Sequence, residues 1–416
     1  MKNKLSQKMV EEAYERLKNV VTMTPLQLNV RLSKKYEAYV YLKREDLQLV
    51  RSYKLRGAYN RISLLTAKER VRGVVCASAG NHAQGMAFSC AKLKVNGTIY
   101  MPKNTPKQKV ERVRVLGGKW VKMVLLGDTF DEANTYAKKY CDQSKKIFVH
   151  PFDDILVMAG QGTVGLEIMN QLEKYPDVIV VPVGGGGLLS GLSTYVKAKD
   201  SSVKIIGVEP AGAPSMSQSL MANKVVTLEK MDKFIDGAAV KTVGTFTFEV
   251  AKKFTDKILL VEEGRVCEEM ISLYQSDGIV TEPAGALSIS ALDQIKNEIK
   301  GQTVVCVVSG GNNDISRYPE IIDRSLVYQG LKHYFIIEFS QRPGALRNFL
   351  DNVLGQNDDI TLFEYTKKNN KETGPALVGI ELADRNDFAP FIKRLDKIGF
   401  TYQILEKNSP LFRLLV

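Results

Sequence analysis

Short apolar segments alternate with longer segments of helical spacing between about residues 38 and 315. Helix-like stretches include residues 130–140, 165–174 and 264–275. We expect buried strands at residues 39–43, 73–77, 95–101, 120–125, 178–183, 204–208, 257–261 and 303–308. This alternation predicts an α/β architecture with mostly parallel, buried sheets.

The pattern changes after Asn313. Residues 314–330 have the pattern of a helical connector, and the rest of the chain predicts a strand, a helix, two strands, a helix and a strand. These elements are expected at residues 334–339, 344–354, 360–367, 376–382, 387–398 and 402–405. The βαββαβ order is that of the ferredoxin-like fold, and the polar segment 368–374 suits the hairpin between its middle strands.

The chain has 416 residues, which is too long for one compact core. We predict two lobes within residues 1–320, of which the smaller spans roughly residues 50–150. A connector is expected at residues 321–330, and a separate C-terminal domain at residues 331–416.

The composition is that of an ordinary soluble protein, with 44% hydrophobic and 25% charged residues. No apolar run is long enough to span a membrane, and the first residues lack the apolar core of a signal peptide. The five cysteines are scattered without a CxxC pair, which predicts a reducing, cytoplasmic setting. The three histidines include no HExxH motif, so no metal site is expected.

The net charge is +12, and much of the excess lies in residues 92–122, which hold nine Lys or Arg and one Glu. A basic surface of this kind can bind nucleic acid. The alternative is the solvated side of a helix at residues 107–116, where basic and apolar residues alternate at helical spacing without interleaved aromatic residues. We favour the helix, and we expect neither a nucleic-acid nor a membrane partner.

Lys54 is the most informative single residue. It lies among small, aromatic and basic residues at the start of a helix-like stretch, between Arg51 and Arg56. Nearby arginines and partial burial disfavour a charged ammonium group, and a neutral amine can form a Schiff base with an aldehyde. Most lysines are solvated surface residues, so Lys54 becomes a strong candidate only beside the motifs that follow it.

The segment 78–85 follows a predicted strand and opens a helix at residues 84–93. The backbone N–H groups at a helix start form a natural site for an anion such as a carboxylate. Asn81 offers both donors and an acceptor to a polar ring. Ser78 and Asn81 are equally consistent with helix capping, and His82 taken alone is better explained as a structural histidine.

Four consecutive glycines, Gly184 to Gly187, lie between a predicted strand and a helix. Their amides are free to approach a phosphate closely, whereas the simplest alternative is a flexible turn. A dinucleotide site is a further alternative, because Glu209 lies about twenty residues on, where a ribose-binding acid would sit. No register of the glycines gives a complete GxGxxG motif, and no P-loop lysine is present.

Ser309 follows the last predicted strand at the carboxyl end of the sheet, where ligands of α/β proteins bind. Alone it is a turn serine. Beside Lys54, the Asn81 loop and the glycines, its hydroxyl could be the partner of a heteroaromatic nitrogen. The four features together indicate pyridoxal phosphate as the cofactor.

Several of these segments, taken together, resemble those of a known enzyme family. The segments KREDLQ, SYKLRGAY, SAGNHAQG, GGGGLLSG and SGGNND together resemble the threonine dehydratases (threonine ammonia-lyases) of the fold type II pyridoxal-phosphate enzymes. The resemblance covers nearly the whole chain, and the motifs are specific in combination. The segment QRPGAL at residues 341–346 is similar to the single ACT-like regulatory domain of the shorter biosynthetic forms.

The resemblance implies two open, twisted parallel-sheet lobes and a C-terminal α+β ferredoxin-like (ACT-like) domain. It also implies the conversion of L-threonine to 2-oxobutanoate and ammonia, the first step of isoleucine synthesis from threonine. Lys54 would hold the cofactor, Asn81 would contact its ring hydroxyl, and Ser309 would contact its ring nitrogen. The implied phosphate-binding residues are Gly184, Gly185, Gly186, Gly187 and Leu188, and the implied loop for the substrate carboxylate is Ser78, Ala79, Gly80, Asn81 and His82.

Two positions depart from related enzymes. Ala79 stands where serine racemases have a second serine, so racemisation should be poor. Glu209 and Ala213 match a cation site of related enzymes, but Ser215 replaces its second acid, which makes a divalent ion doubtful. L-serine dehydratase and serine racemase remain the nearest alternatives, and a nicotinamide dehydrogenase or a non-catalytic amino-acid sensor are more distant ones.

The tail implies allosteric feedback inhibition by isoleucine, with valine as a further candidate effector. Its apolar strands could equally serve as a dimerisation surface. A homo-oligomer is expected, either a dimer or the homotetramer that is usual in the family.

Overall fold

The computed structural model describes residues 4–367, 371–406 and 409–416. The chain divides into two compact units. The first comprises Met1–Glu263 and Ser272–Asn313, and the second comprises Gly264–Ile271 and Asp314–Val416. The division that the sequence predicts at residues 320 and 331 stays a prediction.

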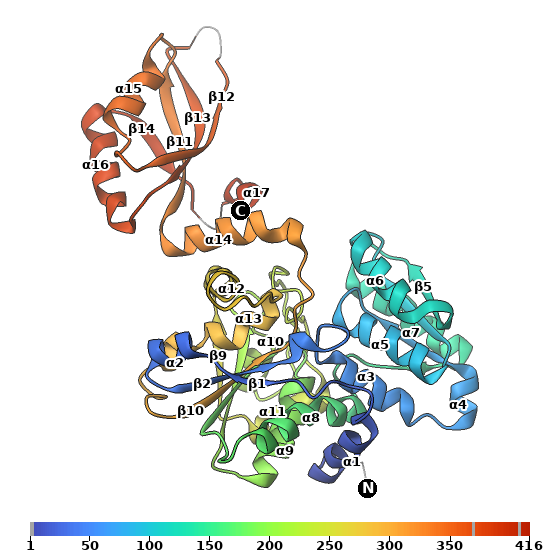
Figure 1. Ribbon diagram of the computed structural model, residues 1–416. Helices are drawn as coiled ribbons and strands as arrows, with labels where there is room; N and C mark the ends of the chain where they lie inside the picture. The colour runs from blue at the N-terminus through green and yellow to red at the C-terminus, as the bar shows by residue number, and fades with distance from the viewer. Residues whose placement is uncertain (1–3, 368–370, 407–408) are drawn as a thin grey trace. The chain divides into compact units, whose positions relative to one another are not determined.

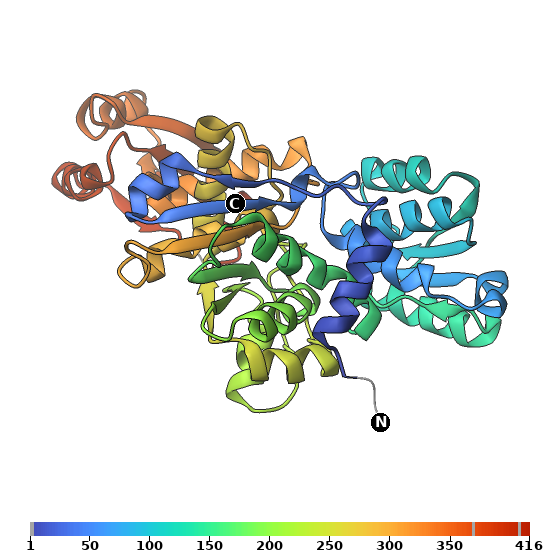
Figure 2. The same cartoon turned by 60° about the horizontal axis from the view of Figure 1, so that its bottom comes forward.

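The first unit contains two lobes, each built on its own sheet (Figures 1 and 2). The larger sheet has six strands in the order β1-β2-β10-β7-β8-β9. These are β1 (Leu26–Leu28), β2 (Tyr39–Arg44), β7 (Val178–Pro182), β8 (Lys204–Pro210), β9 (Lys257–Val261) and β10 (Thr303–Val308). All neighbours are parallel except β1 with β2. The sequence did not predict β1, which is short and lies at the edge.

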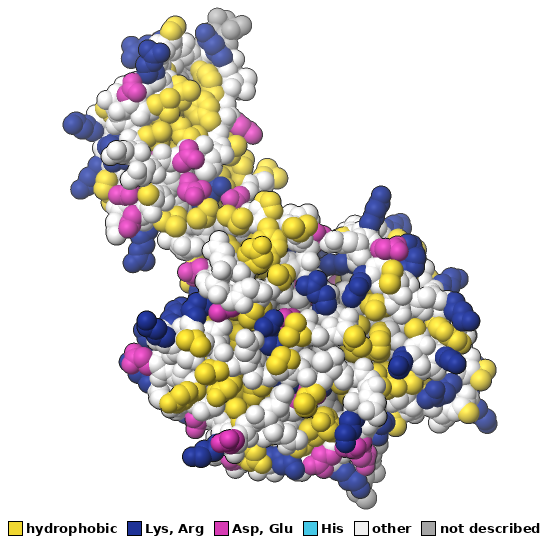
Figure 3. Space-filling model, viewed as in Figure 1, with side chains coloured by type: hydrophobic (Ala, Val, Ile, Leu, Met, Phe, Trp, Pro, Cys, Tyr) yellow, Lys and Arg dark blue, Asp and Glu magenta, His cyan; other side chains and the backbone are white. Residues whose placement is uncertain are grey.

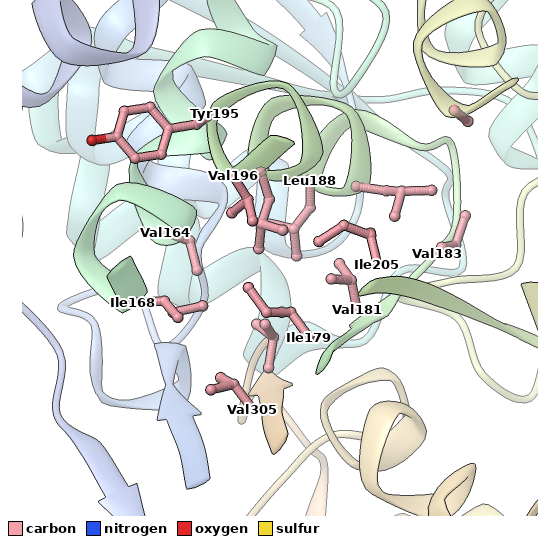
Figure 4. Packing of buried hydrophobic residues seen from close by; sticks show 14 of the residues in the cluster. Val164, Ile168, Ile179, Val181, Val183, Leu188, Tyr195, Val196, Ile205 and Val305 are labelled. Atoms are coloured by element: carbon pink, nitrogen blue, oxygen red, sulfur yellow. The ribbon is translucent and has the colours of Figure 1, made fainter. Parts of the chain in front are cut away.

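Helices cover both faces of this sheet. Helices α8 (Ile155–Gln171) and α9 (Gly187–Lys199) pack over one face with α1 (Gln7–Leu17). Their apolar side chains meet those of β7, β8 and β10 in the cluster of Figure 4, where Val164, Leu188 and Ile179 lie among the labelled residues. Helix α13 (Pro283–Ser290) contacts β7, β8 and β10. A sheet buried on both faces explains why its strands are continuously apolar.

The remaining helices of this lobe lie in the connections between its strands. They are α2 (Val30–Tyr36), α10 (Ser215–Met221), α11 (Thr245–Phe254) and α12 (Glu263–Asp277), of which α12 crosses the boundary between the units.

The smaller lobe has four parallel strands in the order β5-β4-β3-β6. Its elements are α3 (Lys54–Ser63), α4 (Ala67–Arg72), β3 (Val74–Ala77), α5 (Asn81–Leu93), β4 (Gly97–Met101), α6 (Lys107–Gly117), β5 (Val121–Leu125), α7 (Phe130–Ser144) and β6 (Ile147–Phe148). Successive residues of β3 face opposite sides: Cys76 packs toward α5, and Val75 toward α7. On the face seen in Figure 3, the Lys and Arg side chains of this lobe are spread among uncharged atoms.

The second unit has an antiparallel sheet in the order β12-β13-β11-β14. It contains α14 (Tyr318–Gln329), β11 (Lys332–Ser340), α15 (Ala345–Asn352), β12 (Asp359–Tyr365), β13 (Thr373–Glu381), α16 (Phe388–Ile398), β14 (Thr401–Ile404) and α17 (Phe412–Leu415). Alternate residues of β11, such as Phe335 and Ile337, pack into one core with Phe349 of α15 and Phe391 of α16. The other side of the sheet meets α17 through Tyr334. Part of the predicted hairpin segment, residues 368–370, lies outside the described residues.

The predicted fold class is confirmed, and all eight strands predicted before residue 313 are present. The helix predicted at residues 165–174 instead spans Ile155–Gln171, because the apolar residues on all sides of this buried helix hide its period. The short elements β6 and α17 were not predicted. Nowhere in the described ranges is a helix both long and apolar enough to cross a membrane.

Candidate active site

Lys54 is the first residue of α3. Its amine donates a hydrogen bond to the carbonyl oxygen of Pro151 at 3.0 Å and lies 5.2 Å from the ring centre of Tyr53. Burial lowers the pKa of this amine to about 8, and the negative charge of Glu282 partly opposes the effect. The expected depression is therefore due to burial, whereas the expected contribution of neighbouring arginines is wrong for Arg56, whose charge is engaged elsewhere.

Arg56 anchors the first turn of α3 in a fully buried ionic network. Its guanidinium donates to both oxygens of Glu45 at 2.8 Å, and to Glu167 of α8 at 2.6 and 2.9 Å. Lys43 of β2 donates to the same Glu167 at 2.5 Å and to the carbonyl of Thr24 at 2.7 Å. The charges of two cations and two carboxylates thus neutralise each other, and all four groups are shielded from water. They fix the start of α3, and with it Lys54, against the larger lobe.

The glycine segment is a closely packed turn, which argues against the alternative of a flexible one. A Cβ atom added to Gly185 would lie 2.3 Å from the ring of Phe152, and one added to Gly187 would lie 2.5 Å from Oε1 of Gln161. Gly186 has a φ of +88° at the start of α9, a conformation that favours glycine. Thr247 donates its hydroxyl to the carbonyl of Gly185 at 2.7 Å, which holds that carbonyl in place.

The segment around Pro151 brings the glycines to Lys54. The carbonyl oxygen of Pro151 accepts from Lys54, and the next residue, Phe152, packs on Gly185. Gln161 donates to the same carbonyl at 3.4 Å, while its own buried Oε1 has no partner within the described residues. An amine and a glycine cradle at a helix N-terminus fit a phosphate-bearing aldehyde such as pyridoxal phosphate.

The segment 78–82 opens α5 beside these groups. The Ser78 hydroxyl oxygen accepts from the backbone N–H of Gly80 at 3.3 Å and of Ala83 at 3.2 Å, so it takes part in capping as the sequence allows. Asn81 donates to Glu282 at 2.6 Å. His82 contacts the carbonyl of Val149 at 3.0 Å, and burial lowers its pKa to about 3, as expected of a neutral structural histidine.

Ser309 lies at the end of β10, at the same edge. Its hydroxyl donates to the carbonyl of Ala284 at 3.2 Å, and its own carbonyl accepts from the N–H of Tyr53, the residue before Lys54, at 3.2 Å. The hydroxyl would have to turn away from Ala284 to donate to a ring nitrogen. Asn312, three residues later, donates to the Asn81 side chain at 2.7 Å, so the Ser309 and Asn81 loops are joined directly.

Glu282 is a site residue that the sequence reasoning missed. It precedes α13, is 6% exposed, and burial raises its pKa to about 7. It is hydrogen-bonded to Asn81 and lies near enough to Lys54 to influence its charge. The available signal was an acid directly before a proline in an otherwise apolar stretch, a position typical of a buried helix start.

Glu209 does not face this site as a free acid. Its two carboxylate oxygens accept the backbone N–H groups of Met216 at 2.7 Å and Ser217 at 2.8 Å, at the start of α10. Both oxygens are therefore committed to a helix N-terminus, which disfavours a ribose-binding role and the dehydrogenase alternative. Within the described residues, no group of three or more His, Cys, Asp or Glu side chains could hold a metal ion.

Comparison with known proteins agrees with this geometry. The family of pyridoxal-phosphate dependent enzymes matches residues 17–310, and the C-terminal regulatory domain of threonine dehydratase matches residues 323–415. The biosynthetic L-threonine dehydratase of Bacillus subtilis is 55% identical over 409 residues, covering 98% of this chain and 97% of that protein.

Solved structures are similar to the chain as well. Threonine deaminase isoform 2 of Solanum lycopersicum has a TM-score of 0.74 at 38% identity, covering 77% of this chain and 88% of its own. Maize serine racemase has a TM-score of 0.72 at 28% identity, covering 78% and 99%. The chain therefore belongs to the pyridoxal-phosphate dependent enzymes and, among them, to the biosynthetic L-threonine dehydratases with a C-terminal regulatory domain.

Proposed function

We propose that this chain catalyses the pyridoxal-phosphate dependent dehydration and deamination of L-threonine to 2-oxobutanoate and ammonia. The observation that carries the proposal is the link through Pro151 and Phe152, which joins the half-buried amine of Lys54 to the glycine cradle of α9. The relatives that share the full length of the chain are L-threonine dehydratases, which supports the choice of substrate.

The cofactor would be held at four points. Lys54 would bond to its aldehyde carbon, and Asn81 and Ser309 would contact the ring hydroxyl and the ring nitrogen. The backbone N–H groups of residues Gly184, Gly185, Gly186, Gly187 and Leu188 would bind the phosphate at the N-terminus of α9. When bound, pyridoxal phosphate supplies an aldehyde that condenses with amines and a ring that withdraws electrons from the substrate Cα.

The chain's own side chains then move the protons. The start of α5, with Ser78, Ala79, Gly80, Asn81 and His82, would bind the substrate carboxylate through its remaining backbone N–H groups, since that of Ser78 donates to Tyr100 and that of Gly80 to the Ser78 hydroxyl. With its amine free, Lys54 would be a suitable base for the substrate Cα proton, because burial lowers the pKa of this amine. The resulting ammonium group can return that proton to the leaving β-hydroxyl.

Ala79 separates this proposal from racemisation. Its methyl group has no exchangeable proton, so it cannot deliver one to the face of the substrate opposite Lys54. We therefore place serine racemase behind the dehydratases, although a serine racemase is among the structural neighbours. L-serine dehydratase differs only in the substrate, and the ratio of the two rates decides between them.

The test is to incubate the purified protein, supplied with pyridoxal phosphate, with L-threonine and to follow 2-oxobutanoate. We expect rapid formation, and loss of about a thousandfold or more in the Lys54→Ala variant, because both the anchoring amine and the base are removed. Lys92→Ala, on the exposed side of α5, is the matched control and should keep full activity. A wild type that binds the cofactor but forms no 2-oxobutanoate would contradict the proposal.

We further propose that the second unit binds isoleucine as a feedback inhibitor, that valine competes with it, and that the chain acts as a homo-oligomer. The match of residues 323–415 to a regulatory domain supports an amino-acid effector. Removal of residues 331–416 should spare activity and abolish inhibition by isoleucine. Inhibition that survives the truncation would place the effector site in the first unit.

A further inference from the structure

Four groups form a continuous polar chain beside the proposed cofactor site. The side-chain nitrogen Nδ2 of Asn312 donates to the carbonyl of Val50 at 2.8 Å and to Oδ1 of Asn81 at 2.7 Å. Asn81 in turn donates from its Nδ2 to Oε1 of Glu282 at 2.6 Å. The chain thus joins the loop after β10, the start of α5 and the start of α13.

The direction of every hydrogen bond in this series is determined from its Val50 end. The carbonyl of Val50 can only accept, so Asn312 must turn its Nδ2 toward it, and both N–H bonds of Asn312 are then used. Asn81 is left to accept with Oδ1 and to donate with Nδ2 to Glu282. Glu282 can accept this hydrogen bond in either protonation state, because a protonated carboxyl keeps an acceptor oxygen. The orientation of the Asn81 amide therefore follows from its partners, and one of its N–H bonds remains available.

We infer that Asn312 and Glu282 are positioning residues that hold Asn81 with an N–H donor, rather than an oxygen acceptor, turned toward the bound cofactor. The inference rests on the proposed role of Asn81 at the ring hydroxyl. A fixed donor stabilises the ionised form of that hydroxyl, because a hydrogen bond to a charged form favours it. A reversed amide would place an acceptor against the same oxygen and favour the protonated form.

Close packing holds the Glu282 side chain in its hydrogen-bonded position beside Asn81. A Cβ atom added to Gly310 would lie 2.6 Å from Oε1 of Glu282, and one added to Gly237 would lie 3.3 Å from it. The backbone N–H of Glu282 donates to the carbonyl of Gly310 at 3.2 Å. The charged or titratable groups that act on this carboxyl or feel its charge are Lys54, Tyr53, Asp236 and Lys109. The variants tested below leave these four groups unchanged, so a shift in the pH dependence of a variant can be compared directly with the wild type.

The decisive variant is Asn312→Asp, which has nearly the same shape but cannot donate. Its carboxylate would compete with Glu282 for the N–H bonds of Asn81 and would leave none for the cofactor. We expect the dissociation constant of pyridoxal phosphate to rise by about tenfold or more, the loss of a hydrogen bond to a charged group. The absorbance of the cofactor bound to the holoprotein, followed against pH, should also show its midpoint at higher pH.

Two further variants separate polarity from shape. Asn312→Ala removes the side chain without adding an acceptor, so its effect should be smaller than that of Asn312→Asp. Glu282→Gln keeps an oxygen acceptor for Asn81, so cofactor binding should remain within about threefold of the wild type, a difference below 1 kcal/mol. Far-ultraviolet circular dichroism confirms that each variant is folded before it is compared.

A purely structural role predicts the opposite order, with the truncation to Ala more harmful than the isosteric Asp. That order, or equal binding and equal absorbance midpoints in all variants, would overturn the inference while leaving the proposed function intact. A wild-type chain that binds no pyridoxal phosphate would overturn both. A wild type that binds the cofactor without converting L-threonine would overturn the proposed function alone.

Discussion

The interiors of the two units differ in kind. Around Arg56, the first unit buries two cations and two carboxylates, all at most 1% exposed. The core of the second unit is built from aromatic rings. The ring centres of Phe339 and Phe349 are 5.5 Å apart in an edge-to-face arrangement, and those of Phe335 and Phe391 are 5.4 Å apart. In the second unit, the ion pair of Arg394 with Asp358 has one partner that is about one third exposed, and the buried ion pair of Arg265 with Glu269 lies on α12, not on the elements that form the aromatic core.

The difference reflects what each interior must specify. An aromatic core is stabilised by the area that it buries, and it tolerates small changes of shape. A buried ionic network adds little net stability, because its attraction is offset by desolvation, but it fixes directions. The network of the first unit lies two residues from Lys54, where direction matters for chemistry. The aromatic core of the second unit therefore contributes mainly stability, whereas the ionic network of the first unit mainly fixes the geometry around Lys54.

Arg56→Met would break the network most severely, since it leaves Glu45 and Glu167 buried without their principal cation. We expect the first unit to lose about 3–5 kcal/mol of unfolding free energy. The single tryptophan, Trp120, lies in the smaller lobe, so its fluorescence during urea unfolding reports this unit selectively.

The matched control is Arg61→Met on the same helix. Arg61 pairs with Asp154 at 2.8 Å, but both side chains are partly exposed, so the cost should be no more than about 1 kcal/mol. Equal losses in the two variants would show that burial of the Arg56 network carries no special cost.

His150 gives a smaller effect, which depends on pH. Its Nδ1 accepts the backbone N–H of Asp153 at 2.8 Å, so the ring must be neutral, and burial lowers its pKa from 6.5 to about 4. The folded state binds fewer protons than the unfolded state between these values. Its stabilising contribution is therefore complete above about pH 6.5 and is lost as the pH falls through about 4.

His150→Asn removes this titration, while the Asn oxygen can still accept from Asp153. We expect the unfolding free energy of the wild type to fall by on the order of 2 kcal/mol more than that of the variant between pH 7 and 4. His82, which also titrates at acid pH, is present in both proteins and cancels in the comparison. Parallel pH profiles would show that His150 is accessible to protons in the folded state.

The same contrast separates what the sequence could and could not predict. The second unit follows local rules: alternation along β11 and helical spacing in α16 place Phe335 and Phe391 in one core, and the βαββαβ order was predicted correctly. The first unit's strands were likewise predicted, because buried parallel strands are continuously apolar. Short edge elements such as β1 were not predicted, because a segment of three residues is too short to show a hydrophobic periodicity.

The sequence motifs predict the candidate site residues, and this prediction does not include residues that distant contacts bring beside them. Lys54, Asn81 and the glycines can be identified as candidates from their residue types and from their positions beside predicted strands and helix starts. Glu282 is separated from Asn81 by two hundred and one positions, and only the tertiary fold brings the two side chains together. In the same way, Arg56 looked like a neighbour that would repel a charge on Lys54, and the carboxylates that neutralise it lie elsewhere in the sequence.

The smallest effect is expected in the aromatic core. Phe391→Leu keeps an apolar side chain of similar volume, so the second unit should lose about 1 kcal/mol, compared with about 3–5 kcal/mol for Phe391→Ala. Circular dichroism should detect both losses, whereas the Trp120 transition and the formation of 2-oxobutanoate should stay at wild-type values. If Phe391→Leu instead lowers activity or shifts the Trp120 transition, then the second core also fixes geometry in the first unit. The two interiors would then have to be treated as one cooperative system.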